Sequence, residues 1–432
     1  MLKLALKNIW ARRRANGWLF AELVAVTVVA WMMIDPLVVQ LYDRSLPVGY
    51  DTDRLCMIKV LSEVEGAPGY DAALTDSAST AADYMRLVEI ARRLSGVEKA
   101  TPLKSFCYPD AGSQASLGVY GDADSTMYMV SFMYFMPGSD FFSTYGIGGV
   151  DGGTAESLDR MRFRGGKSRN DGQRDFVISE AVARNMFKPG NVAGRTLSLG
   201  DDSVKVGAVC ADVRYLSSSR NPTMLFIPDY DVSLSPGNSA LILVRLSPGV
   251  DAGEWVEEFR ERMPRFTSGN LHAREAYTYR SMTDMHLYSN GGSDMRLKTG
   301  LLVFFLLNLS LGVFGTLWLQ TRRRAEEAGV MKAFGATRCH IVGLVVTESV
   351  ILTVAAWLAG CLIYLQVALY NGLSQGQNHY LVFDHSWAGN FALHFAVVSG
   401  LVLALLLAVA VVGVLLPAMT IARVRPIDSL NS

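Results

Sequence analysis

Four long apolar runs dominate this sequence and are spaced unevenly along it. They cover residues 17–42, 299–320, 341–370 and 391–416. Each is long enough for the roughly 20 apolar residues that a helix needs to cross the hydrocarbon core of a bilayer. With 50% hydrophobic residues, 19% charged residues and a mean hydropathy of +0.23, the chain is also more apolar than an ordinary soluble enzyme. We therefore predict an α-helical membrane protein with four transmembrane helices, one early and three late.

Basic residues near the ends of these runs indicate how the chain crosses the membrane. They precede the first run, fill the stretch between the second and third, and follow the fourth: Lys3, Lys7, Arg12, Arg13 and Arg14; Arg322, Arg323, Arg324, Lys332 and Arg338; Arg423 and Arg425. Because Lys and Arg accumulate on the cytoplasmic side, we expect both termini, the loop 321–340 and the tail 417–432 in the cytoplasm. Residues 43–298 and the short loop 371–390 then lie outside it.

The first 16 residues are predicted to form an amphipathic helix in the membrane interface. A helix over 1–16 places Leu2, Leu6, Ile9 and Trp10 near one face and the basic residues elsewhere. A simple charge anchor is the alternative. A cleaved signal peptide is a further alternative, but no small-residue cleavage site ends the apolar run, which favours a membrane anchor.

The segment 43–298 is predicted to be an α+β domain with two similar ends. Residues 43–104 contain a strand at 54–61 and a helix at 79–97, where Thr80 and Asp83 have the spacing of a capping box. Residues 239–298 contain a strand at 241–246 and a helix at 251–263.

A mainly β insertion, residues 105–238, separates these two strand-then-helix halves. It carries strand-like runs such as 122–137 and 203–213, broken by Gly, Asp and Pro. The methionine-rich stretch 127–136 favours a buried strand over a soft ligand patch. Residues 151–174 favour a surface loop, and their Gly-Gly-Lys-Ser lacks the first glycine of a phosphate-binding loop.

Cysteine and histidine patterns indicate no metal or catalytic centre. One pair among Cys56, Cys107 and Cys210 could form a disulfide outside the cytoplasm, but small buried thiols are favoured. The histidines lack zinc-ligand spacing and no nucleophile elbow is present; they are His272, His286, His340, His379, His385 and His394. We predict that the chain is not an enzyme and holds no cofactor.

Three segments resemble the MacB/FtsX-type permeases of ABC transporters. They are 322–343 (RRRAEEAGVMKAFGATRCHIVG), 175–215 (DFVISEAVARNMFKPGNVAGRTLSLGDDSVKVGAVCADVRY) and 416–430 (LPAMTIARVRPIDSL). Two departures are a Glu-Glu-Ala-Gly where Arg-Glu-Ile-Gly is usual, and Asp428-Ser429 where Glu-Ala is common. The resemblance implies a bacterial cytoplasmic (inner) membrane protein, a separate ABC ATPase subunit that binds ATP and Mg, and a dimer with a second permease copy or a paralogue.

The cytoplasmic loop is predicted to be the contact with that ATPase. A short helix over 325–336 would begin with acidic residues and end with Lys332 and Gly335, in keeping with the helix dipole. Val330, Met331 and Phe334 share a face that could enter a groove, as the resemblance implies for the family's coupling helix. A tight turn packed on the chain's own helices is the alternative. The candidate residues are Glu326, Glu327, Gly329, Val330, Met331, Lys332, Phe334 and Gly335.

Acidic residues within the spans favour snorkelling to the interface or hydrogen bonds between helices over a proton path. Glu22 and Glu348 are expected near the cytoplasmic interface and Asp35 near the outer one.

The chain is therefore expected to be the permease subunit of an ABC complex with a lever-like action on molecules outside the cytoplasm, in efflux or in lipoprotein or peptide handling. Lipids and a periplasmic or outer-membrane protein are further expected partners, and nucleic acid is not. Alternatives are a peptide-sensing partner of a sensor kinase and a scaffold that regulates a cell-wall hydrolase.

Overall fold

The computed structural model divides the chain into two compact units. The helical unit comprises Met1–Tyr42, Asp294–Gly376 and Asp384–Ser432, and the β-rich unit comprises Asp43–Ser293 and Gln377–Phe383. The structure describes residues 2–104, 108–110, 116–121, 126–150, 152–163, 175–199, 202–231, 239–287, 293–322, 330–332, 334–376 and 383–421. Predictions for Cys107, for residues 164–174 of the predicted loop 151–174 and for most of the tail 417–432 lie outside these residues. In the described part of that loop, residues 155–159 form a short helix, which the loop prediction missed.

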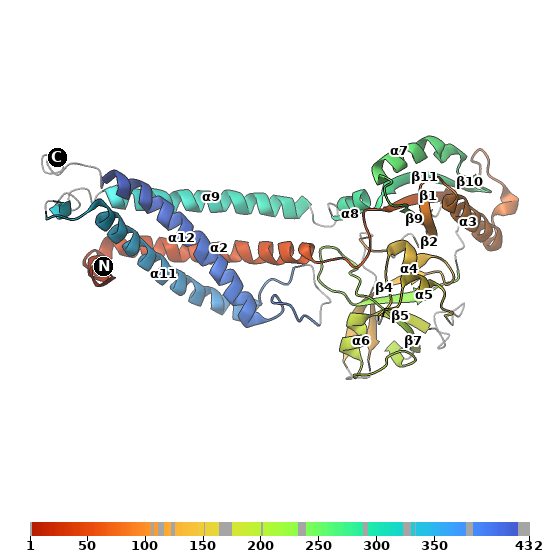
Figure 1. Cartoon of the computed structure of the whole chain (residues 1–432), viewed down its shortest axis with the longest axis horizontal. Coiled ribbons are helices and arrows are strands. Elements are labelled where there is room, and N and C mark those ends of the chain that lie inside the picture. Colours follow the sequence, from red (N-terminus) through yellow and green to blue (C-terminus); the bar gives the residue numbers. More distant parts are fainter. Residues whose placement is uncertain are drawn as a thin grey trace. The chain divides into compact units, whose positions relative to one another are not determined.

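Four long apolar helices make up most of the helical unit (Figure 1). They are α2 (Arg13–Ser45), α9 (Ser293–Arg322), α11 (Arg338–Asn371) and α12 (Phe391–Ile421). All four are long and apolar enough to cross a membrane by length and composition, and in α9 this holds for Thr299–Thr316. Each contains one of the four predicted spans and extends beyond it, because a helix continues through the polar residues that flank its apolar part.

Packing in the helical unit centres on Trp31 of α2. Its fully buried ring stacks on Tyr364 of α11 and Phe395 of α12, with ring centroids 4.3 and 5.0 Å apart. The indole Nε1 donates a hydrogen bond to the Ser399 hydroxyl at 3.1 Å. Thus α2, α11 and α12 share one core, whereas no side chain described in the spanning segment of α9 is buried.

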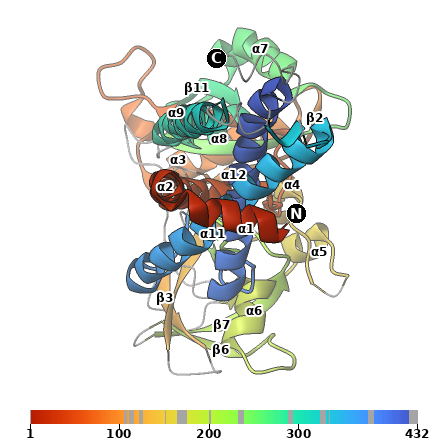
Figure 2. The same cartoon turned by 90° about the vertical axis from the view of Figure 1, so that its left-hand side faces the viewer.

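The N-terminal helix α1 (Leu2–Ala11) is shorter than predicted, and α2 begins at Arg13 (Figure 2). Its predicted single apolar face is divided in the structure. Ala5 is buried and Ile9 packs on the core of the bundle, whereas Leu6 and Trp10 are exposed. The two exposed residues retain the position that an interfacial helix requires.

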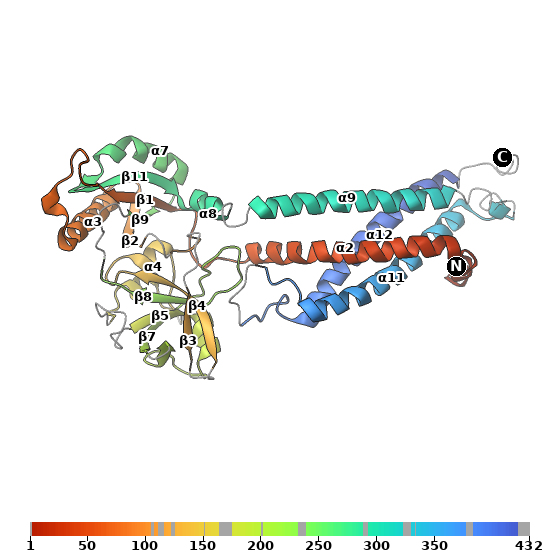
Figure 3. The same ribbon diagram turned by 180° about the vertical axis from the view of Figure 1, so that it is seen from behind.

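A five-stranded antiparallel sheet forms one half of the β-rich unit (Figure 3). Its order is β10 (Thr267–Ser268), β11 (Leu271–Thr278), β1 (Leu55–Ser62), β9 (Ser239–Leu246) and β2 (Val97–Leu103). In β1, Cys56 and Ile58 share a core with α3 (Ser77–Arg92) and α7 (Ala252–Arg262), while Leu55 and Met57 enter a second core. Burial on both faces explains why the β1 sequence is a continuous apolar run.

The start of α3 differs from the prediction. Asp76 is the N-cap, and its side chain accepts hydrogen bonds from the backbone N–H groups of Ala78 and Ser79. The capping box of Thr80 and Asp83 was therefore wrong. Asp76 satisfies two of the free N–H groups of the first turn, and Thr80 lies within the helix with its hydroxyl on the Asp76 carbonyl at 2.8 Å.

The inserted segment forms a closed barrel with short helices. The strand order is β3 (Ser116–Tyr120), β4 (Met127–Phe135), β8 (Met224–Pro228), β5 (Asp175–Ser179), β7 (Asp202–Cys210) and β6 (Thr196–Leu199). The accompanying helices are α4 (Phe141–Tyr145), α5 (Ala155–Asp159) and α6 (Glu180–Met186). Strand β4 is almost fully buried, which confirms the strand interpretation of this methionine-rich stretch.

Two features complete the β-rich unit. Phe383, from the segment between α11 and α12, packs on Tyr128 of β4 with ring centroids 4.6 Å apart. Cys56 and Cys210 are both buried free thiols, which confirms the interpretation favoured over a disulfide for these two. Burial raises the pKa of the Cys56 thiol to about 12.

A tight contact between α2 and α11 predicts a packing defect on substitution. A Cβ atom added at Gly360 would lie 2.5 Å from the Cβ of Thr27, so Gly360→Ala should overpack this contact. We expect it to lower the free energy of unfolding by about 1–3 kcal/mol. Thermal unfolding of the full-length protein in detergent measures this. Gly343→Ala, on the same helix but with open space around it, should cause no loss; equal effects of both variants would contradict the assignment.

Candidate functional site

The predicted coupling residues that the structure describes form one tight turn before α11. Residues 330–332 are helical, and the backbone N–H groups of Phe334, Gly335 and Ala336 donate to carbonyls within 330–332 at 2.9–3.2 Å. Gly335 has a φ of 89°, the left-handed conformation that ends the turn. Thr337 then caps α11 by accepting from the His340 N–H. Glu326, Glu327 and Gly329 lie outside the described residues.

This turn divides the predicted apolar face. Met331 is half-buried and packs with Ala336 against the buried Ile341, as a turn packed on the chain's own helix would require. Phe334 is 89% exposed and Val330 is 47% exposed, as a docking surface would require. An aromatic side chain this exposed is suited to insertion into a partner.

Buried acidic residues in the helical unit form hydrogen bonds between elements. Glu348 of α11 accepts from the side-chain amide of Asn8 in α1 at 2.7 Å. Asp35 of α2 lies 2.7 Å from Nε2 of His394 in α12 and accepts from the Ser374 N–H at 3.0 Å. The role predicted for both acids, hydrogen bonding between helices, is thus confirmed.

Sequence reasoning missed the partners of these acids. His394 was one of six scattered histidines, although Asp35 near the end of the first span and His394 near the start of the fourth would lie at similar depth in antiparallel helices. Glu22 makes a weaker contact of 3.5 Å with the Thr316 hydroxyl, and its second oxygen is buried with no hydrogen-bond partner among the described residues.

Two buried arginines bind the segment that leaves α2 for the β-rich unit. Arg220 forms an ion pair with Asp43 at 3.0 Å, and these side chains are 2% and 0% exposed. The Arg214 guanidinium donates to the carbonyls of Asp43, Leu46 and Pro47 on one side. On the other side it donates to the carbonyls of Ser217 and Ser219. Arg214 thus replaces the hydrogen bonds that an irregular backbone would otherwise lack.

A neighbouring loop joins this segment to the start of α8 (Tyr279–Leu287). Asp110, with a φ of 56°, accepts from the Ser217 N–H at 2.8 Å and from the Tyr50 hydroxyl at 3.3 Å. The Tyr279 hydroxyl donates to the Pro109 carbonyl at 2.9 Å. We call these residues the anchor cluster: Asp43, Tyr50, Asp110, Arg214, Arg220 and Tyr279. It fixes the segment after α2 and the helix that precedes α9 to the same loops of the β-rich unit.

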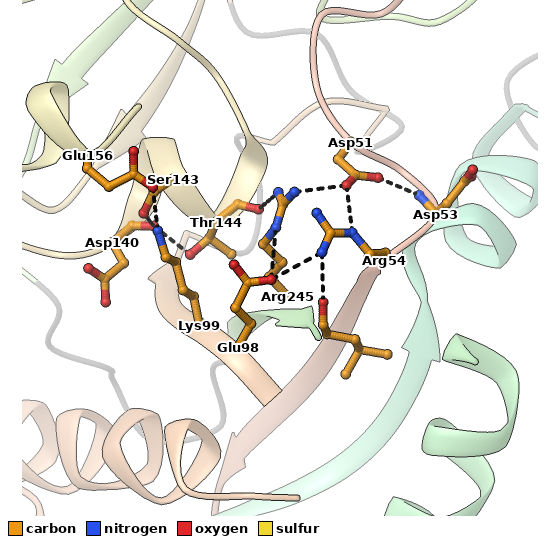
Figure 4. Close-up of polar contacts among 11 residues, drawn as sticks. Asp51, Asp53, Arg54, Glu98, Lys99, Asp140, Ser143, Thr144, Glu156 and Arg245 are labelled. Atoms are coloured by element: carbon orange, nitrogen blue, oxygen red, sulfur yellow. Dashed lines mark hydrogen bonds and ion pairs between the residues drawn. The ribbon is translucent and has the colours of Figure 1, made fainter. Parts of the chain in front are cut away.

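A second polar group, the junction network, connects the sheet to the helices of the barrel (Figure 4). Arg245 of β9 binds Asp51 at 3.0 Å, the Thr144 carbonyl in α4 at 3.0 Å and Glu98 of β2 at 3.7 Å. Arg54 bridges the same two carboxylates at 3.3 and 3.1 Å. Nearby, Lys99 binds Glu156 of α5 at 2.9 Å. Two arginines shared between two carboxylates hold the sheet and α4 in one arrangement.

These sites offer hydrogen bonds, ion pairs and exposed apolar residues, and their chemistry suits binding and the transmission of movement. Within the described residues, no group of three or more His, Cys, Asp or Glu side chains could hold a metal ion.

Comparison with known families identifies the class of protein. A model of the FtsX-like permease C-terminal domain matches residues 299–426, and one of the MacB-like periplasmic core domain matches residues 40–262, which is more than half of the chain. The chain belongs to the MacB/FtsX-type family of ABC transporter permeases. The β-rich unit is thus a periplasmic MacB-like domain on an inner-membrane permease with several apolar helices. Members of this family are generally not enzymes, and membership implies an ATPase partner in general.

Individual relatives are distant. The permease is 23% identical over 285 residues to YknZ, an ABC transporter permease of Bacillus subtilis (strain 168), covering 64% of this chain and 67% of YknZ. A permease domain from Porphyromonas gingivalis has 20% identity and a TM-score of 0.30, covering 53% of this chain and 92% of that one. The periplasmic region of MacB from Actinobacillus actinomycetemcomitans has 11% identity and a TM-score of 0.29, with 55% and 94% covered.

The buried Arg220–Asp43 pair predicts a large loss of stability on mutation. Arg220→Met leaves the Asp43 carboxylate buried without this partner and should lower the free energy of unfolding by about 3–5 kcal/mol. Arg280→Met removes an ion pair to Asp53 in which both side chains are more than two-thirds exposed, and should cost no more than about 1 kcal/mol. Denaturant unfolding of the full-length permease in detergent compares the two. Similar losses in the free energy of unfolding for the two variants would contradict the prediction that the Asp43 carboxylate is buried and depends on Arg220.

The environment of Asp110 predicts a pH-dependent stability. Burial raises the pKa of Asp110 above its ordinary 3.8, against the lowering effects of Ser217, Tyr50 and Arg214. Because the pKa is raised in the folded state, the contribution of Asp110 to the free energy of unfolding is complete below pH 3.8. It is lost as the pH rises through the folded-state pKa. Asparagine also tolerates the positive φ, so Asp110→Asn should remove this loss of stability with rising pH.

The melting temperature of the full-length Asp110→Asn permease should therefore rise relative to that of the unchanged protein as pH increases from 4 to 8. A constant difference across this range would contradict the prediction. Asp229→Asn, at a partly exposed carboxylate paired with Lys104, serves as the control.

Proposed function

We propose that this permease converts ATP-driven movement of a separate ATPase subunit into a change of its periplasmic domain. In this proposal ATP and Mg bind to the ATPase, and the permease contributes the turn 330–336 as the docking surface. Phe334 inserts into a groove of the ATPase, Val330 packs beside it, and Lys332 and Gly335 shape the turn. Glu326, Glu327 and Gly329 complete the surface.

One observation carries this proposal: α2 is an unbroken helix from Arg13 to Ser45. It therefore carries Asp35, bonded to α12 in the helical unit, and Asp43, bonded to Arg220 in the β-rich unit. The helix backbone connects these two sites, with Pro36 between them removing one backbone hydrogen bond, and in this proposal displacement of one end is passed to the other. The anchor cluster gives the displacement a rigid attachment in the periplasmic domain.

The remaining features agree with a complex that works as a dimer. In this proposal both termini and the turn 330–336 lie in the cytoplasm. The apolar residues of α9 are exposed, among them Leu301, Leu307 and Leu311, and a second copy or a paralogue would cover them. The substrate class is a molecule handled outside the cytoplasm, by efflux or as a lipoprotein or peptide, with a periplasmic or outer-membrane partner.

Phe334→Ser tests the docking role. Loss of this aromatic residue should lower retention of the ATPase by about tenfold or more, because exposed aromatic residues that become buried dominate binding energy. Tyr370→Ser is the matched control: Tyr370 is also about 90% exposed, near the far end of α11. Co-purification of the ATPase with full-length permease and stimulation of its ATP hydrolysis are measured. Unchanged retention in Phe334→Ser, or an equal loss in Tyr370→Ser, would exclude Phe334 as the docking residue.

A further inference from the structure

A cavity in the periplasmic domain lies between the end of α7 and the start of α8, beside β11. Its volume is about 380 Å³, within the range of roughly 300–1,000 Å³ that small-molecule sites occupy. Three methionines contribute to its lining: Met263 after α7, the buried Met282, and the 58% exposed Met285 in α8. Methionine side chains are flexible and adapt to apolar ligands of variable shape.

Two arginines supply positive charge to the same cavity. Arg274 is the extra residue of a β-bulge, because Glu275 pairs with Lys59 and Ala273 pairs with Val60, leaving Arg274 without a partner in the ladder. A β-bulge changes the direction of the side chain at the extra residue. Among the described residues its guanidinium has no hydrogen-bond or ion-pair partner. Arg260 of α7 also lines the cavity and forms an ion pair with Glu257 at 2.5 Å.

The only acidic residue of the lining is already engaged. Glu275 lies 3.6 Å from Lys59, so it does not neutralise Arg274. Tyr277 adds a hydroxyl: burial raises its pKa well above the ordinary value, and it therefore remains protonated and able to donate a hydrogen bond. The cavity thus combines a mainly apolar interior with donors suited to one anion.

Strand addition by a peptide is the competing use of this edge. Strand β10 pairs with β11 only at His272 and Leu271, so the later part of β11 is open on that side. Arg260, however, lies close to this part and donates to the Ala276 carbonyl at 3.4 Å. This charged side chain of α7 lies at the backbone of β11 where an added strand would have to pair, and the lining is mainly apolar.

Chain connectivity indicates where such a ligand would come from. Met285 precedes Ser293, the first residue of α9, by only eight residues, so even a fully extended connection would span at most about 30 Å. The chain connection therefore limits the distance between this cavity and the first residue of α9, a helix long and apolar enough to cross a membrane. A single acyl chain suits its volume better than a lipid with two chains.

We propose that this cavity binds a single-chain amphiphile with one anionic headgroup, such as a fatty-acid carboxylate. The carboxylate lies at Arg274 and Arg260, and the chain packs on Met263, Met282 and Met285. The assignment rests on the cavity alone and does not depend on docking of the ATPase to Phe334.

Equilibrium binding of radiolabelled laurate to the full-length permease, in nanodiscs of a zwitterionic lipid, tests this site. Saturable binding is expected. Arg274→Met and Met285→Glu should each weaken it by about tenfold or more, because the first removes a charge-assisted hydrogen bond and the second adds a repelling charge. Arg265→Met is the matched control, since Arg265 is an exposed arginine of the adjacent turn outside the lining. It should leave affinity within about twofold, and the melting temperatures should match.

Competition separates the possible ligands. Dodecanol, which lacks the charge, and acetate, which lacks the chain, should compete poorly. Absence of saturable binding, an unchanged affinity in Arg274→Met, or equal competition by dodecanol would overturn the proposal. Displacement of laurate by phosphatidylglycerol placed in the nanodisc would overturn the single-chain assignment, and displacement by an extended peptide but not by decanoate would favour strand addition instead.

Discussion

The attachment of α2 to two buried arginines is the constraint on which the β-rich unit depends. The last turn of this helix brings Asp43 into a site from which water is excluded, where a carboxylate is stable only with a cation beside it. Arg220 neutralises the charge, and Arg214 satisfies the backbone carbonyls that the chain exposes where the helix ends. Both arginines come from one short stretch after β7, so a single loop of the barrel side holds the entry of the chain.

The sheet and the barrel depend on each other through burial of both faces of the sheet. One face is covered by α3 and α7, and the other contributes Met57 and Leu243 to a core that also contains Phe142 and Phe226 of the barrel side. Removing either partner would expose an apolar face of the sheet to water. The junction network makes this apolar contact directional, because Arg54 and Arg245 each bridge Asp51 and Glu98 and restrict the rotation that hydrophobic packing alone permits.

Local patterns made much of the fold predictable. The four long apolar helices follow from apolar runs, and β1 and β9 follow from short apolar runs whose burial on both faces explains their lack of alternation. The cap of α3 was assigned wrongly because two acceptable capping residues, Asp76 and Thr80, lie one turn apart. The error concerns which side chain accepts hydrogen bonds from the first backbone N–H groups of α3. The spacing of residues in the sequence does not decide this.

The site residues were much less accessible from sequence, since their partners are remote. Arg214 binds the carbonyl of Asp43, which is 171 positions away, and Arg245 binds Asp51 across 194 positions. Hydrophobic periodicity reflects local secondary structure and does not indicate which distant residues form a pair. One signal was present: Arg214 stands between the apolar residues Val213 and Tyr215, and a charged residue with two apolar neighbours needs a partner if it is buried.

Polar contacts inside the helical unit determine how its helices can move. Apolar helix surfaces in a bilayer have little preference between neighbouring registers, because lipid tails are as apolar as leucine. A hydrogen bond between helices contributes only about 0.6–2 kcal/mol, but it exists in one register alone. Glu348 with Asn8 and Asp35 with His394 therefore select one arrangement of α1, α2, α11 and α12. In the proposed mechanism, a displacement that begins at Phe334, just before α11, is passed on by α2, α11 and α12 as a group, because sliding of one helix would leave a buried carboxylate unpaired.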